Sequence, residues 1–86
     1  MWNLDFVNEM IADKQHRISD DEAFIREADF SRDLTDTVNS RAALLQRLTK
    51  LEEIRAEMEK CSAINNMNDY ISQKALVYTL IQAYKA

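Results

Sequence analysis

The hydrophobic residues of this chain recur at spacings of three and four positions, which is the pattern of amphipathic α-helices. Near the N-terminus, five of them fall within one arc of about 160° at 100° per residue. Asn3 precedes this arc and is a preferred N-cap residue, so the pattern predicts a helix over about 3–17. The residues of the arc are Leu4, Phe6, Val7, Met10 and Ile11.

A second helix start is predicted in the stretch that follows. Ser19 with Glu22 three positions later is a capping-box pattern, and the acids between them favour a helix N-terminus. This pattern predicts a bend near Ile18–Ser19 and a new helix from residue 20.

The longest predicted helix covers residues 35–62. Its hydrophobic positions mostly step by three, so the apolar stripe drifts around the helix and the two halves should contact different neighbours. The four residues Asn65–Asn68 form the clearest break, since three are asparagines, which cap helices and tolerate turns. Asn66 with Asp69 predicts the cap of a last helix over about 67–85.

The composition fits an all-helical chain and excludes several classes of enzyme. The 86 residues include no glycine and no proline. Phosphate-binding loops, dinucleotide-binding turns and nucleophile elbows need glycine, and tight β-hairpins usually do. We therefore expect one all-α domain over residues 1–86, a three- or four-helix antiparallel up-and-down bundle with one long central helix.

The charge is unevenly distributed along the chain. The net charge is −4, whereas residues 18–40 alone carry −5, from seven acids and two arginines. An acidic chain is a poor candidate for direct nucleic-acid binding. The acidic segment is interpreted first as a solvated helix face; the alternative is a mimic of nucleic acid that blocks a basic, nucleic-acid-binding partner.

The cysteine count and hydropathy indicate an intracellular, cytoplasmic protein. One cysteine, Cys61, allows no internal disulfide, which fits a reducing compartment, although a bridge between two chains is an alternative. No basic leader is visible, and no apolar run approaches the ~20 residues that span a bilayer, so no membrane partner is expected.

Candidate chemistry is sparse, and we predict no catalytic residue, cofactor or metal. Glu9, Asp13 and His16 form a row on one helix face, but the second copy that a di-iron helical site requires is missing. Cys61 has no histidine near it in sequence and is interpreted as a structural thiol. Residues 34–50 loosely resemble a helix of the all-helical chorismate mutases, which implies a dicarboxylate site formed by residues such as Arg41 and Arg47.

The last predicted helix is the main candidate for function. Apolar and aromatic side chains cover roughly 220° of its circumference, which exceeds what packing against one core requires. We expect a small acidic protein–protein interaction module, such as an adaptor, an assembly chaperone or an inhibitor. It would bury an apolar helix face against a partner, and the first candidate for that partner is a second copy of the chain, in a homo-oligomer. The predicted interface consists of Tyr70, Val77, Ile81 and Tyr84, followed by Trp2 and Phe6.

Overall fold

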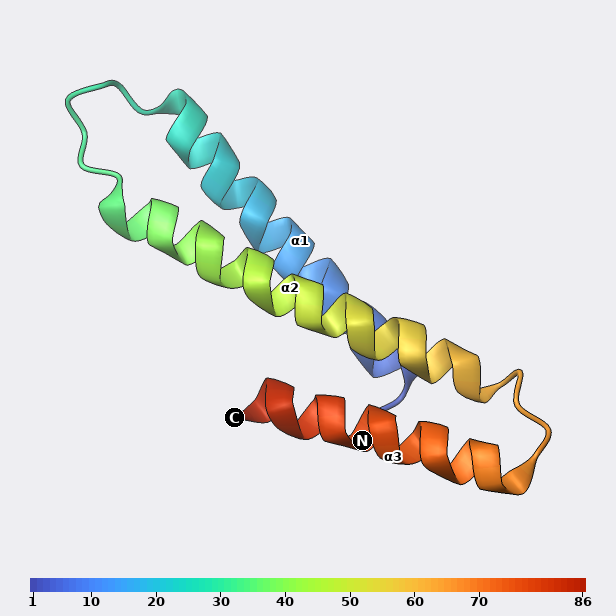
Figure 1. Cartoon of the computed structure of the whole chain (residues 1–86). Coiled ribbons are helices and arrows are strands. Elements are labelled where there is room, and N and C mark those ends of the chain that lie inside the picture. Colours follow the sequence, from blue (N-terminus) through green and yellow to red (C-terminus); the bar gives the residue numbers. More distant parts are fainter.

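The computed structural model describes all residues 1–86 and contains three helices and no strand (Figure 1). The helices are α1 (Leu4–Glu27), α2 (Thr35–Cys61) and α3 (Met67–Lys85). They run up, down and up, and α2 is both the longest helix and the central one. The prediction of an all-α bundle with one long central helix is confirmed. None of the three helices has the length and hydrophobicity needed to cross a membrane.

Two asparagine caps begin the outer helices, as the sequence predicts. Oδ1 of Asn3 accepts a hydrogen bond from the backbone N–H of Phe6 at 2.8 Å. Oδ1 of Asn66 accepts one from the N–H of Asp69 at 3.1 Å. Each bond satisfies a helix N–H that has no intrahelical partner, which fixes where α1 and α3 start.

The predicted bend at Ile18–Ser19 is wrong, because α1 continues unbroken through it. Val7, Ile11 and Ile18 are all buried, and their spacings of four and seven place them on one helix face. Beyond Ser19 the helix keeps its contacts with α2, where Ser40 donates a hydrogen bond to Asp21 and Arg41 pairs with Glu22, and a bend at Ser19 would break these contacts. No glycine or proline interrupts the helix, so the capping-box residues stay within it.

The first chain reversal instead lies at residues 28–34 and is built on two aspartates. Asp29 accepts hydrogen bonds from the N–H and hydroxyl of Ser31. Asp33 accepts equivalent bonds from Thr35, at 3.0 Å and 2.7 Å. These bonds lower the pKa of both carboxyl groups below the ordinary aspartate value. Turns closed by aspartate side chains replace the glycine that this chain lacks.

The core occupies the region where all three helices overlap. Leu51 and Ile54 of α2 are 0 % and 1 % exposed and lie between the other two helices. The cluster of buried residues comprises Val7, Ile11, Leu51, Ile54, Val77, Ile81 and Tyr84. α1 and α3 do not pack directly against each other along their lengths, so α2 holds the bundle together.

The other half of the molecule is a two-helix hairpin that projects beyond α3 (Figure 1). Polar contacts join its helices: Oγ of Ser40 donates to Asp21 at 3.0 Å, and Arg41 pairs with Glu22 at 3.3 Å. The molecule measures 59 × 21 × 18 Å, and its radius of gyration is 16.9 Å. A compact chain of this length would have about 12 Å. The chain is therefore long and thin, with a core at one end.

Core packing at Leu51 should carry much of the stability. Replacing Leu51 with Ala removes a fully buried side chain and leaves a cavity between three helices, so we expect a loss of about 2–5 kcal/mol in the free energy of unfolding. Leu76→Ala, on the exposed side of α3, should cost less than about 1 kcal/mol. Urea unfolding followed by circular dichroism measures both. Equal losses for the two variants would contradict the assigned core.

A polar contact between α2 and α3 should make stability depend on pH. Glu57 accepts a hydrogen bond from Lys60 at 2.8 Å and one from Nε2 of Gln73 at 2.7 Å. These two bonds lower the pKa of Glu57 below the ordinary glutamate value. The resulting stabilisation is present above the ordinary pKa and is lost as pH falls through the lowered pKa.

Glu57→Gln should therefore reduce the loss of stability on acidification, with Asp29 and Asp33 supplying the remainder. Glu53→Gln is the matched control, because Glu53 forms no ion pair or hydrogen bond. Urea midpoints measured from neutral to acid pH test this expectation. An acid profile for Glu57→Gln identical to that of the wild type would contradict it.

Candidate interaction surface

An open apolar groove lies between the N-terminal segment, the end of α2 and one flank of α3. Its volume is about 330 Å³, and eight of its ten lining residues are hydrophobic. We call it the end groove. It is lined by Trp2, Asn3, Leu4, Met58, Cys61, Tyr70, Lys74, Val77, Tyr78 and Ile81. Among these, Lys74 carries the one formal charge, so the groove suits apolar and aromatic groups.

Trp2 forms one wall of the end groove and links the two ends of the chain. The Asn3 cap places Trp2 just before the first turn of α1. The indole ring meets the ring of Phe6 edge-on at 5.2 Å and that of Tyr84 at 5.8 Å. Edge-to-face pairs at these centroid distances are favourable, so Trp2 attaches the start of α1 to the end of α3.

Arg47 holds the same end of α3 from the α2 side. Its guanidinium lies 3.9 Å above the centre of the Tyr84 ring. It also donates a hydrogen bond to the carbonyl oxygen of Tyr84 at 3.3 Å. A cation at a helix C-terminus and over an aromatic face is favourable on both counts. Tyr84 is thereby fixed between Trp2 and Arg47.

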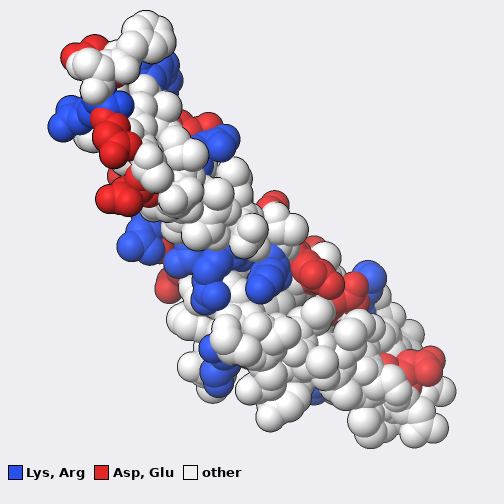
Figure 2. Space-filling view, turned by 60° about the vertical axis from the view of Figure 1, so that its left-hand side comes forward, with Lys and Arg blue, Asp and Glu red and all other residues white.

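Beside the end groove, α3 exposes a row of large apolar side chains. Met67, Ile71 and Tyr78 fall within about 40° on the helix circumference, and Ile71 and Tyr78 are 58 % and 64 % exposed. We call these three residues the exposed α3 strip. Of the 19 residues of α3, only Asp69, Lys74 and Lys85 are charged. Figure 2 shows a broad uncharged area over this half, whereas charges of both signs are interspersed along the hairpin.

The structure shows how exposed each of the predicted interface residues is. Val77, Ile81 and Tyr84, expected on an outward strip, are instead buried in the chain's own core, and Val77 and Ile81 also line the end groove. Tyr70, Trp2 and Phe6 are half-buried, and of these Trp2 and Tyr70 line the end groove. Because α3 is apolar on two sides, periodicity alone did not identify the side that faces α2. The other apolar side, at Met67, Ile71 and Tyr78, belongs to the same pattern and is the exposed one.

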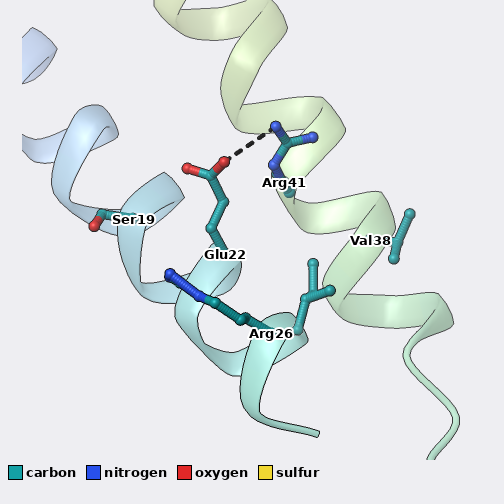
Figure 3. Close-up of a pocket in the computed structure, with 6 residues that line it drawn as sticks. Ser19, Glu22, Arg26, Val38 and Arg41 are labelled. Carbon is teal, nitrogen blue, oxygen red and sulfur yellow. Dashed lines mark hydrogen bonds and ion pairs between the residues drawn. The ribbon is translucent and has the colours of Figure 1, made fainter. Parts of the chain in front are cut away.

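A second hollow, of about 620 Å³, lies on the hairpin (Figure 3). Glu22 of α1 and Arg41 of α2 point toward each other across it and form an ion pair at 3.3 Å. Arg47 is engaged with Tyr84 instead. The resemblance to chorismate mutases implies that Arg41 and Arg47 converge on one pocket. The structure shows that they do not.

The remaining candidate residues form no further site. His16 is exposed and lies 3.5 Å from Asp20, one helical turn along α1. No group of three or more histidine, cysteine or acidic side chains is placed to hold a metal ion. Cys61 is a free thiol, half-buried at the edge of the core.

The chain was compared with protein-family models, curated proteins and solved structures, and no match was found.

Removing the Trp2 wall should open the end groove and expose Cys61. In Trp2→Ala we expect faster reaction of the single thiol with Ellman's reagent, together with a loss of about 1–3 kcal/mol from the lost aromatic contacts. Phe30→Ala is the control, because Phe30 is fully exposed in the loop between α1 and α2. This loop lies at the opposite end of the molecule (Figure 1). Equal thiol reactivity in wild type and Trp2→Ala would contradict the assigned groove wall.

Proposed function

We propose that this chain is a small acidic protein–protein interaction module that buries apolar helical surface in the end groove and along the exposed α3 strip. The observation that carries the proposal is the adjacency of an apolar groove to large exposed side chains on a helix with few charges. Contiguous exposed apolar surface of this kind is typical of binding sites. An adaptor, an assembly chaperone or an inhibitor would use it in the same way, by covering an apolar face of its partner.

The accessible surface of the chain supports this proposal. It amounts to 6305 Å², and only 8 of the 86 residues are buried. A typical folded monomer of 10 kDa exposes about 5,200 Å². The elongated fold thus leaves about 1,000 Å² more surface than its mass requires, and a small core gains stability when such surface is covered.

The alternative proposal, an acidic mimic of nucleic acid, has less structural support. Several acids of residues 18–40 are engaged by hydrogen bonds or ion pairs within the chain, among them Asp21, Glu22, Asp29 and Asp33. Arginines are interspersed with these acids along the hairpin (Figure 2). A mimic of a phosphate backbone would need a continuous row of unpaired acids.

A neutral apolar dye tests the proposed binding face. Nile red should bind the dilute wild-type chain, and its emission should shift to shorter wavelength. Tyr78→Asp places a carboxylate at the rim of the groove and should weaken binding at least about tenfold, the equivalent of 1.4 kcal/mol. Phe24→Asp is the matched control, since Phe24 is a partly exposed aromatic residue on the hairpin. Circular dichroism verifies that both variants remain folded.

The same assay identifies the kind of partner. A synthetic amphipathic helix, with leucines on one face and balanced glutamate and lysine on the other, should displace the dye with weak salt dependence. A scrambled peptide of equal composition should not displace it. Absence of dye binding, or equal losses for Tyr78→Asp and Phe24→Asp, would refute the proposal. Tight binding to polylysine that disappears at high salt would favour the acidic mimic instead.

A further inference from the structure

We infer that the occupant of the end groove is a second copy of this chain, bound about a two-fold axis with the two α3 helices antiparallel. This inference rests on the proposed function and names its partner. Its basis is that one face of the molecule contains both a hollow and the side chains suited to fill a hollow.

The shape of this face meets the requirement for a symmetric dimer. In a two-fold dimer the same patch meets itself, so it must present both a protruding and a receiving part. Tyr78 belongs to the protruding part and to the receiving part, because its side chain is 64 % exposed and also lines the end groove. Ile71 lies on the same flank of α3, about two turns earlier. With the two α3 helices antiparallel, Tyr78 and Ile71 of each copy lie against the groove of the other.

The elongated shape leaves enough surface for one interface of ordinary size. The excess over a typical monomer of this mass is about 1,000 Å². A standard protein–protein interface buries about 800 Å² on each partner. Covering one such patch would bring the exposed surface of each copy close to that of a compact chain of its mass.

The charge distribution also permits two copies to meet at this face. The whole chain has a net charge of −4. Residues 18–40 alone have a net charge of −5, so the rest of the chain has a net charge of +1. These acids lie on the hairpin, which projects away from α3 (Figure 1). Antiparallel α3 helices send the two hairpins in opposite directions. The acidic segments are then separated by far more than the screening length of about 8 Å at physiological salt.

Lys74 does not prevent this contact. Its ammonium lies 5.4 Å from the centre of the Tyr70 ring and 3.5 Å from the Tyr70 hydroxyl. The charge is thus held over an aromatic face of its own chain, where the alkyl stem covers apolar surface.

The oligomeric state, together with the reactivity of Cys61, tests the inference. The wild-type chain should sediment with twice its monomer mass of 10.0 kDa at high concentration and dissociate on dilution. Cys61 lines the end groove, so its reaction with Ellman's reagent should slow as the dimer forms. Ile71→Asp should raise the dissociation constant at least about tenfold, since it buries a carboxylate between the two copies.

Leu76→Asp is the control on the same helix. Leu76 is 43 % exposed but lies on the opposite side of α3, so this variant should dimerise like the wild type. If the wild type stays monomeric while Nile red still binds, a second copy is not the occupant and the interaction module stands. If it is monomeric and binds no dye, both proposals fail. If Leu76→Asp and Ile71→Asp disrupt the dimer equally, the assigned face is wrong.

Discussion

The packing of Leu51 and Ile54 between α1 and α3 is the interaction on which the rest of the structure depends. Both side chains are almost completely buried, and α2 is the only helix that packs along both neighbours. The other contacts of α3 surround this pair: Leu48 and Met58 of α2 pack at the edge of the same cluster, and polar contacts to α2 and the aromatic contact between Trp2 and Tyr84 lie outside it. These two aliphatic residues thus lie at the centre of the cluster that joins all three helices into one domain.

This dependence divides the molecule into two unlike halves. Where the three helices overlap, apolar side chains form the core, and one flank of α3 is left uncovered beside the end groove. In the hairpin Ile18 is buried, and polar pairs such as Glu22 and Arg41 accompany apolar side chains that are only half-buried, such as Ile25 and Leu44. Hydrophobic surface buried against a second chain adds stability where the core is small, whereas exposed ion pairs add little. The association that we propose therefore belongs at the α3 end.

The sequence was sufficient to predict the helical fold and its caps, but not which side of each helix is buried. Asn3 and Asn66 marked helix starts because a cap is a local hydrogen bond. Ser19 also begins a capping pattern, yet α1 continues through it, and the following turn contacts α2 through Asp21 and Glu22. On α3, two apolar sides were visible, and only packing against Leu51 and Ile54 decides that Val77 and Ile81 face inward.

Amide hydrogen exchange at low and high protein concentration tests both the core at Leu51 and Ile54 and the proposed association along α3, because it reports on each segment separately. The account predicts the strongest protection in the part of α2 around Leu51 and Ile54, and weaker protection in the hairpin beyond α3. It further predicts that protection along α3 rises with concentration while that of residues 18–40 does not change. Uniform protection along α2, or a concentration-dependent rise confined to the hairpin, would contradict it.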